Sequence, residues 1–539
     1  MPRISRIVKV LATASFAVAA PSLSLPSFAS DPTVQTDPQG GAIQEALAHP
    51  SAPLSGYNLN LNALRGFYAS RNNLPAWSEG SAEERNANAA IAILESAQTE
   101  GLDPDAYRLD AIRARQKLSS PGARAEFDLL LTAGMLSYLH DLRIGRVAQS
   151  DVGRDIELPP IAFDAAAELS RVLADGTLDR EVAALEPPHQ EYANLKVALA
   201  RYRDMQSKGG WPLVDVSPSL KLDADDARLA DLRRRLAAED GAVSLERGTD
   251  PAGELAQAIV RYQAHNGLEE TGTVGKATLA ALNVPVDRRI GQIIANMERW
   301  RWLPRPFEQT YIEVNTADAT LKVVDHGAII LTSRIIAGKL ATPTPIFSTT
   351  VTALTVNPYW NIPSVIARNE ILPKERRHPG YMAAQHIFAD GPDGSLRQKP
   401  GPDNALGYLK LEMPNRFNAY LHDTPSRSLF ARNDRHFSHG CMRVQQIWPL
   451  ASWALSGSTD SAIDKIKAAV ASGSNQRISL DRPLSVYVLY WTVIADQGGS
   501  VEFRPDVYGR DTKLLAALAG QRLTGRLSLN TNCQAGVAG

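Results

Sequence analysis

The kind of apolar pattern in the sequence changes near residue 308, and this change constrains the fold more than any other feature. From about residue 56 to 205, apolar residues recur at helical spacing, most clearly over residues 127–140. After residue 308 they alternate or form β-branched runs, as in residues 310–315 and 328–337. At roughly 100–200 residues per domain, 539 residues make about three domains. The sequence therefore predicts a multidomain α+β protein in which a helical scaffold precedes a mostly-β domain.

The first residues have the layout of an export signal. Three basic residues precede an apolar run over residues 10–20, and a small-x-small triplet follows at residues 27–29. The apolar run is far shorter than the roughly 20 residues that a membrane-spanning helix needs. We therefore expect a signal peptide over residues 1–29, cleaved after Ala29, and a periplasmic mature protein. A disordered or weakly amphipathic N-terminus and an uncleaved anchor are the alternatives.

Composition and charge narrow the function classes. The hydrophobic content of 44% and the charged content of 21% are ordinary for a globular protein. The formal net charge of −1 leaves no dominant basic field, so nucleic acid is not expected as a partner. Proline, glycine and changes of pattern divide the chain into a signal peptide (1–29), a flexible leader (30–55), a helical scaffold domain (56–217), a second helical unit (218–285), a connecting helix (286–307), a β-rich domain (308–512) and a C-terminal tail (513–539).

The unit over residues 218–285 has a helix–loop–helix pattern. Leu255, Ile259 and Tyr262 share one face of a helix that Gly267 ends, and a short second helix follows a glycine-containing loop. This segment resembles the small three-helix peptidoglycan-binding domain found in many cell-wall enzymes. The resemblance implies the fold more directly than it implies ligand binding, and a spacer without a ligand is the alternative.

Only two cysteines occur, and they lie in different settings. Cys441 belongs to a cluster rich in histidine and glycine, whereas Cys533 lies in a tail of small and polar residues over 530–539. Exported proteins usually pair their cysteines in disulfides, so a bridge between the two is one alternative. The contrast between the two settings favours a free thiol at Cys441.

The segment over residues 420–444 concentrates reactive side chains, with Cys441 and three of the ten histidines. A thiol becomes a good nucleophile when an imidazole takes its proton. Gly440 lets the backbone turn so that adjacent N–H groups converge on a developing oxyanion. Three alternatives remain on residues alone. A Cys/His metal site would need further ligands, a papain-like protease would have its histidine far downstream, and a buried cysteine would be purely structural.

The tetrad Ser-His-Gly-Cys ends at Cys441, and fifteen residues, 423–437, separate it from His422. This arrangement resembles the signature of the L,D-transpeptidase (YkuD-type) catalytic domain, in which a histidine is followed after roughly 14–17 residues by Ser/Thr-His-Gly-Cys. One departure is Arg443, where many short members carry Asn. Four flanking segments look like those of the long members with a helical scaffold and a peptidoglycan-binding module: residues 402–407, 421–425, 483–491 and 506–510.

The resemblance implies a catalytic role for each residue of this motif. Cys441 would be the nucleophile that attacks a stem tetrapeptide. His422 would be the general base, oriented by the backbone carbonyl of Asp423. His439 would lie beside the thiolate and either tune it or shape the oxyanion site. The backbone N–H groups of Gly440 and Cys441 would form the oxyanion hole.

The resemblance also implies how substrate is held. Residues 357–407, which have an irregular pattern, resemble the capping insert of long members, which would cover the active site and exclude water. A long surface excursion is the alternative. Arg443 would bind a substrate carboxylate, with a structural salt bridge as the alternative. His436, off the fixed motif positions, is expected at the surface. Three aromatic residues would line the groove unless they are core residues: Tyr420, Tyr359 and Trp360.

The implied function is that of an L,D-transpeptidase. Such an enzyme would release D-Ala from a stem tetrapeptide, hold the rest as a thioester and pass it to a second stem, forming a 3–3 cross-link. The alternatives are an L,D-carboxypeptidase, an enzyme that attaches an outer-membrane protein to the wall, and a non-catalytic wall-binding protein. Expected partners are peptidoglycan stem peptides, other cell-wall synthesis enzymes and carbapenem-type β-lactams as covalent inhibitors. No metal or organic cofactor is implied.

Overall fold

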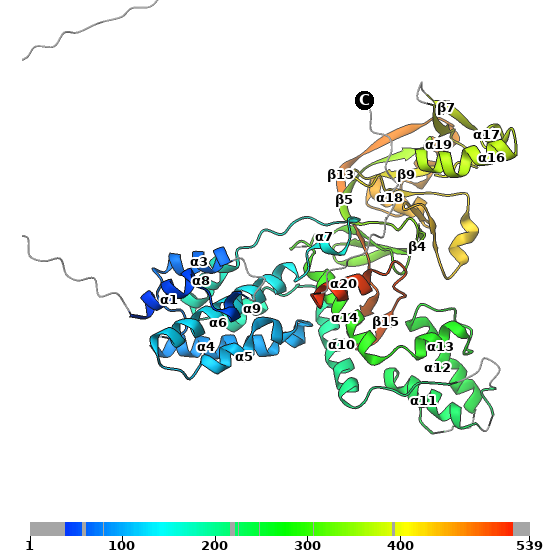
Figure 1. Cartoon of the computed structure of the whole chain (residues 1–539). Helices are drawn as coiled ribbons and strands as arrows, with labels where there is room; N and C mark the ends of the chain where they lie inside the picture. The colour runs from blue at the N-terminus through cyan, green and yellow to red at the C-terminus, as the bar shows by residue number, and fades with distance from the viewer. Residues whose placement is uncertain are drawn as a thin grey trace, which may run out of the picture.

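The computed structural model has a helical lobe, a small three-helix unit and a β-rich lobe (Figure 1). It describes residues 38–55, 61–78, 80–215, 221–224, 226–246, 248, 250–305, 307–390 and 394–520. The expected signal peptide and Cys533 lie outside these residues. Within them, no helix combines the length and apolar character needed to cross a membrane.

The helical lobe is built around α6 (Pro121–Ile144), which is buried along most of its length. On this helix, the buried Asp128 carboxylate accepts the N–H groups of Ala76 and Trp77 at 2.7 and 2.9 Å. These bonds offset the cost of burying a carboxylate. The remaining elements are α1 (Pro38–Ala48), α2 (Ala52–Ser55), α3 (Leu61–Ser70), α4 (Gly80–Glu95), η1 (Ser96–Glu100), η2 (Pro104–Tyr107), α5 (Leu109–Arg115), α7 (Gln149–Val152), α8 (Ala165–Asp175) and α9 (Leu178–Ala183).

Helix α1 corrects the expectation of a flexible leader over residues 30–55. Its Ile43 is fully buried and its Leu47 is 9% exposed. Both side chains join the core of the helical lobe, together with Leu64 and Phe67. Ile43 and Leu47 are four residues apart and so share one helix face. The glycine and alanine around them concealed this short apolar stripe.

Helices α10 (Gln190–Ser207) and α14 (Val286–Arg301) pack together and join the lobes. Trp300 of α14 stacks on Trp491 of the β-rich lobe, with 4.5 Å between ring centroids. Arg299 of α14 pairs with buried Asp511 of α20 (Arg510–Leu518) at 2.6 Å. The chain expected to be a tail from residue 513 is therefore helical to 518, because Leu514 is fully buried in this joint.

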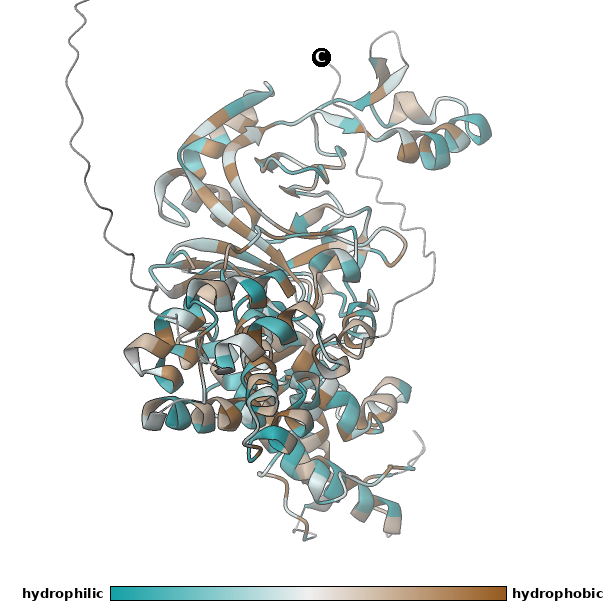
Figure 2. Cartoon of the chain, turned by 60° about the vertical axis from the view of Figure 1, so that its left-hand side comes forward, coloured by the Kyte–Doolittle hydropathy of each residue, from teal (hydrophilic) through white to brown (hydrophobic). Residues whose placement is uncertain are grey.

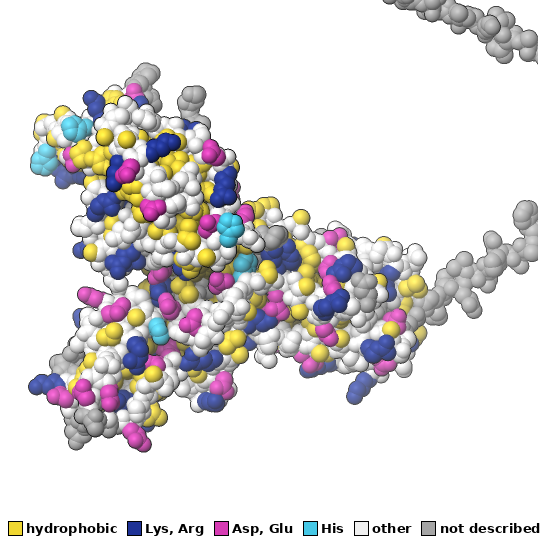
Figure 3. Space-filling view, turned by 180° about the vertical axis from the view of Figure 1, so that it is seen from behind, with side chains coloured by type: hydrophobic (Ala, Val, Ile, Leu, Met, Phe, Trp, Pro, Cys, Tyr) yellow, Lys and Arg dark blue, Asp and Glu magenta, His cyan; other side chains and the backbone are white. Residues whose placement is uncertain are grey.

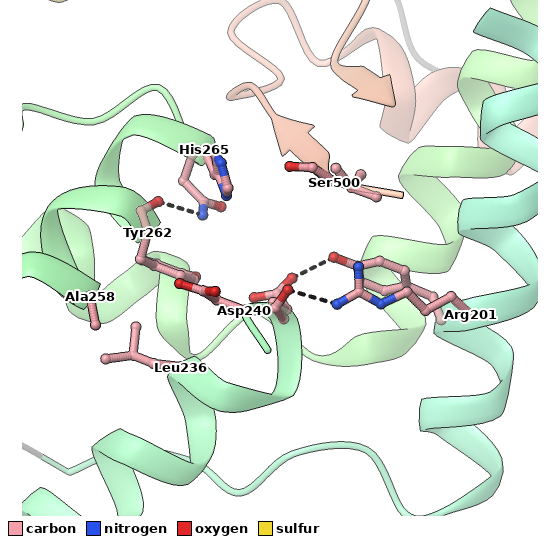
Figure 4. Close-up of a pocket in the computed structure, with 11 residues that line it drawn as sticks. Arg201, Leu236, Asp240, Ala258, Tyr262, His265 and Ser500 are labelled. Atoms are coloured by element: carbon pink, nitrogen blue, oxygen red, sulfur yellow. Dashed lines mark hydrogen bonds between the residues drawn. The ribbon is translucent and has the colours of Figure 1, made fainter. Parts of the chain in front are cut away.

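The small unit consists of α11 (Ala227–Glu239), α12 (Pro251–His265) and α13 (Lys276–Leu282) around a core of its own. It is anchored to α10 (Figure 4). The Tyr202 hydroxyl donates to the Glu239 carboxylate at 2.6 Å, and Arg201 donates to the Glu239 carbonyl, also at 2.6 Å. The cavity at this junction has a volume of about 20 Å³, room for little more than one water molecule. The junction is therefore an anchor and not a ligand site.

The β-rich lobe contains β1 (Ile156–Glu157), β2 (Tyr311–Asn315), β3 (Thr320–Asp325), β4 (Ala328–Gly338), β5 (Ile346–Val356), β9 (Leu409–Glu412), β10 (Leu421–His422), η4 (Arg427–Ala431), β11 (His436–Ser438), β12 (Met442–Val444), α18 (Ile447–Ser456), α19 (Ile463–Ala471), β13 (Gln476–Leu489), β14 (Val493–Ala495) and β15 (Val501–Phe503). The main sheet has the order β1-β5-β13-β2-β3-β4-β12-β10-β9, and the pairing of β5 with β9 closes it into a barrel. Apolar and polar residues alternate along its long strands (Figure 2), and the apolar side chains fill the interior.

Residues 357–407, expected to be irregular, contain a small folded unit at the top of Figure 1, which we call the cap. It consists of β6 (Trp360–Ile362), α15 (Ser364–Ile366), the π-helix η3 (Ala367–Ile371), α16 (Leu372–Arg377), α17 (Tyr381–Ala384), β7 (Ile387–Asp390) and β8 (Ser395–Gln398). Its sheet has the order β6-β8-β7. The elements are so short that no periodicity builds up, which is why the sequence alone did not reveal them.

Charged side chains of both signs are interspersed over the face of the molecule drawn in Figure 3. This distribution agrees with the formal net charge of −1. The face has no broad basic field of the kind that attracts nucleic acid.

Candidate active site

A tight turn between two strands holds Cys441. Strand β11 runs parallel to β4 and β12 runs antiparallel to it, so the chain reverses over residues 439–441. Gly440 sits in this reversal with a φ of 113°, a conformation that L side chains rarely adopt. The Ser438 hydroxyl accepts the Gly440 N–H at 3.1 Å and donates to the Cys441 carbonyl at 2.6 Å. The Cys441 thiol at the end of this turn forms no disulfide with a described residue and is half-buried, and its Sγ lies 3.8 Å from the Asn418 carbonyl oxygen.

Strand pairing brings His422 to the same face as the cysteine. Strands β10 and β12 are parallel, with Leu421 opposite Met442 and His422 opposite Arg443. Alternate residues of a strand point to one face, so Cys441 and Arg443 share a face with His422 and with Tyr420. The Met442 N–H donates to the Tyr420 carbonyl at 3.0 Å, which extends the pairing to the residue beside the cysteine.

The His422 ring is buried and fixed by the backbone. Its Nδ1 lies 2.5 Å from the Asp423 carbonyl oxygen, the contact that the sequence predicted, so that prediction is confirmed. Burial lowers the pKa of His422 to about 3, and the nearby charges of Arg443 and Lys410 act in the same direction. The ring is therefore neutral, and with Nδ1 donating its proton to a carbonyl, Nε2 carries the lone pair.

Asp423 is itself held in place, which fixes the carbonyl that orients His422. Its carboxylate accepts from Arg427 at 2.7 Å and from the Tyr408 N–H at 3.1 Å. Gly407, with a φ of 59°, packs against it so closely that a Cβ there would lie 2.5 Å from the Asp423 carboxyl carbon. Glycine at this position thus allows the supporting carboxylate to pack under the site.

Arg443 places a guanidinium beside the nucleophile. Burial lowers its pKa, while Cys441 acts in the opposite direction. Among the residues that the structure describes, no carboxylate forms a salt bridge with Arg443, and the structural salt bridge considered from the sequence is not present there. A positive group of this kind is suited to bind an anion from outside the chain.

The remaining neighbours come from elements that the sequence did not connect to the site. Lys410 on β9 lies opposite His422, and its ammonium is 4.5 Å from the centre of the Tyr420 ring. His439 is partly exposed, and its Nε2 lies 2.6 Å from a carboxylate oxygen of Glu370 in the cap. Lys410 and Glu370 lie outside any recognisable motif, so no local pattern signalled them.

Three family models match successive parts of the chain. They are a scaffold domain over residues 62–199, a "Putative peptidoglycan binding domain" over 228–282, and the L,D-transpeptidase catalytic domain (YkuD) over 309–466. The third match includes both His422 and Cys441. The chain contains an L,D-transpeptidase catalytic domain. The domain types and the α+β multidomain fold predicted from the sequence are thereby confirmed.

Individual proteins similar to this chain share a modest fraction of its residues. A Haemophilus influenzae protein described as a "Putative L,D-transpeptidase" is 31% identical over 244 residues, which cover 41% of this chain and 48% of that protein. The chain thus spans about half the length of this curated relative.

Among solved structures, an Enterococcus faecium L,D-transpeptidase with a cysteine-to-serine substitution is 15% identical, covering 34% of this chain and 50% of that one, with a TM-score of 0.16. A Xylanimonas cellulosilytica L,D-transpeptidase is 15% identical over 51% and 99% of the two chains, with a TM-score of 0.18. An avibactam carbamoyl enzyme is 14% identical over 46% and 83%, with a TM-score of 0.18.

Two expectations for the L,D-transpeptidase domain need correction. His436 was expected at the surface, but its side chain is 8% exposed and contacts the Thr316 carbonyl at 2.9 Å. Its position on β11, which pairs with β4, draws it inward. The Gly440 N–H was expected in the oxyanion hole, but it donates to Ser438. Gly440 therefore contributes to the site through the backbone conformation of the turn. Of the two N–H groups expected in the oxyanion hole, we keep only that of Cys441 as a proposed donor.

Two aromatic residues expected in the substrate groove of the L,D-transpeptidase domain belong to the base of the cap. Tyr359 is 36% exposed, and the Arg397 guanidinium lies 4.4 Å from its ring centre. Trp360 packs against the cap core. Tyr420 is the aromatic residue that the strand register places beside Cys441.

Proposed function

We propose that this chain is an L,D-transpeptidase that forms 3–3 cross-links in peptidoglycan through a thioester on Cys441. The observation that carries the proposal is the pairing of His422 with Arg443 on adjacent strands, with Cys441 one residue before β12 and on the same face. Together they supply a thiol, a neutral imidazole and a guanidinium. A thiol with an imidazole base can carry out acyl transfer, and a guanidinium can bind the carboxylate of the peptide that is transferred.

In the first half of the reaction, Nε2 of His422 accepts the proton of the Cys441 thiol, and the thiolate attacks the carbonyl of the third stem residue. The thiolate stabilises the new imidazolium beside it. The Cys441 N–H donates to the oxyanion, and Arg443 binds a substrate carboxylate. The C–N bond to D-Ala then breaks, and the imidazolium protonates the amine of D-Ala. D-Ala departs, and the rest of the stem stays on Cys441 as a thioester.

In the second half, the side-chain amine of another stem gives a proton to His422 and attacks the thioester. The C–S bond breaks, and the proton on His422 returns to the thiolate. Water in place of the amine would make the enzyme an L,D-carboxypeptidase, so the cap has the role of excluding water. Tyr359 and Trp360 at its base would then line the entrance for the stem.

The match to a peptidoglycan-binding domain supports a location in the cell envelope, where this polymer lies. We propose a periplasmic enzyme whose three-helix unit binds peptidoglycan near the barrel. A carbapenem would acylate Cys441, because its strained amide carbonyl presents the same electrophile as the donor stem. Other cell-wall synthesis enzymes remain proposed partners.

The test is intact-mass spectrometry of the mature protein incubated with a disaccharide-tetrapeptide, beside a Cys441→Ala control. The half-buried thiol fills no core position, so the control should stay folded. A thioester adduct and a 3–3 dimer, both absent in the control, are expected. A tripeptide without dimer would indicate a carboxypeptidase. If neither an adduct nor a product forms, the proposed enzymatic activity is contradicted, and a non-catalytic wall-binding protein becomes the favoured interpretation.

A further inference from the structure

The cap contacts the nucleophile turn through a pair of side chains that the proposed reaction does not use. Oε1 of Glu370 lies 2.6 Å from Nε2 of His439, two residues before Cys441. Glu370 belongs to the π-helix η3, a rare element that often occurs at functional sites. Ile366 and Ile371 anchor this turn in the cap core. Glu370 thus ties the cap directly to the active site.

Nε2 of His439 has two neighbours of opposite charge. Besides Glu370, the ammonium of Lys339, just after β4, lies 3.4 Å from this nitrogen. A carboxylate only accepts hydrogen bonds, and an ammonium only donates them. A neutral imidazole therefore carries its proton on Nε2 when Glu370 is its partner, and on Nδ1 when Lys339 is its partner.

We propose that Glu370 is a positioning residue that couples the cap to the nucleophile turn by selecting the tautomer of His439. When the cap lies against the barrel, the His439 Nε2–H donates to Glu370, and the ring is held beside Cys441. When the cap moves away, Lys339 donates to Nε2 and the proton shifts to Nδ1. Under this coupling, the nucleophile turn is prepared for reaction only when the cap is closed over a donor stem. This coupling rests on the proposed function of Cys441.

The first test is ¹⁵N NMR of the full-length protein labelled at histidine, with His439 assigned from a His439→Gln variant. In the wild type, Nε2 of His439 should show the shift of a protonated ring nitrogen. In Glu370→Ala, Nδ1 should show it instead. His422, whose Nδ1 contacts the Asp423 carbonyl, appears in the same spectrum and reports that the barrel remains folded.

The second test measures acylation of Cys441 by the tetrapeptide in the same variants. Glu370→Ala should react about tenfold more slowly, the size expected for losing one charge-assisted hydrogen bond. The matched control is Asp390→Asn, which breaks an ion pair with Arg397 inside the cap and should react like the wild type.

An unchanged His439 tautomer or an unchanged acylation rate in Glu370→Ala would overturn the coupling. Absence of acylation in the wild type would instead overturn the proposed function. The two failures are distinguishable because the NMR measurement needs no turnover and decides the tautomer by itself.

Discussion

The barrel and the cap both reach the nucleophile turn, but they are stabilised in different ways. The barrel strand that carries His422 is paired on both sides, and core residues next to it, such as Leu421 and Met442, are fully buried. The six core residues of the cap are each 5% to 8% exposed, so none is fully buried. The barrel therefore holds the reacting groups at fixed positions, while the cap can open at a lower free-energy cost.

The largest expected effect tests whether the chemistry belongs to the barrel. His422→Gln removes the proton acceptor for Cys441 and should slow its acylation about 10²–10⁴-fold. The rate is followed by intact mass with the tetrapeptide. His326→Gln is the matched control, because that histidine is 77% exposed at the turn between β3 and β4. Equal rates for the two variants would remove His422 from the mechanism.

The second prediction compares one core residue from each region. Leu421→Ala should destabilise the barrel by about 3 kcal/mol, because it opens a cavity in a fully buried site. Ile366→Ala should leave the urea unfolding transition of the barrel unchanged and should instead speed hydrogen exchange in the cap. Urea unfolding and hydrogen exchange measure the two effects. If Ile366→Ala lowers barrel stability as much as Leu421→Ala does, the two regions unfold as one unit.

The third prediction concerns pH and the buried ring of the barrel. Burial lowers the pKa of His422 to about 3, whereas in the unfolded chain it is about 6.5. Below pH 6.5 the unfolded chain thus binds a proton that the folded barrel does not. The stability that the barrel gains from a neutral His422 is therefore fully present above pH 6.5 and is lost as pH falls toward 3. Relative to His422→Gln, the wild type should lose about 1.4 kcal/mol per pH unit between about pH 5.5 and 4. Parallel curves of unfolding free energy against pH would contradict this.

The smallest effect is expected from a surface pair of the cap. Asp390 and Arg397 form an ion pair at 2.6 Å, with side chains that are 43% and 33% exposed. Because solvent screens such pairs, Asp390→Asn should change the free energy of cap opening by less than about 0.5 kcal/mol. Hydrogen exchange in β7 and β8 measures it. A larger change would mean that surface charge, more than the small core, holds the cap together.

The β-rich character of the catalytic lobe and part of the site could be predicted because their signals are local, whereas the closure of the sheet into a barrel was not predicted. The tetrad that ends at Cys441 is contiguous, and the spacing to His422 lies within one short segment. The resemblance predicted a capping insert over residues 357–407, but not the strands and helices inside it, because these are too short for a periodic pattern. The interpretation of His436 as a surface residue was wrong, because only the pairing of β11 with β4 decides which way it points.

By itself, the sequence determined the residue types and spacings of the site, the change from helical to β-rich structure, and the resemblance to the L,D-transpeptidase domain. Only the tertiary structure decided that the Gly440 N–H is already bound, that Arg443 has no carboxylate partner among the described residues, and that Glu370 reaches His439. The physical reason is distance along the chain. Glu370 and His439 are 69 residues apart, and strand register and loop closure, which no local pattern encodes, bring them together.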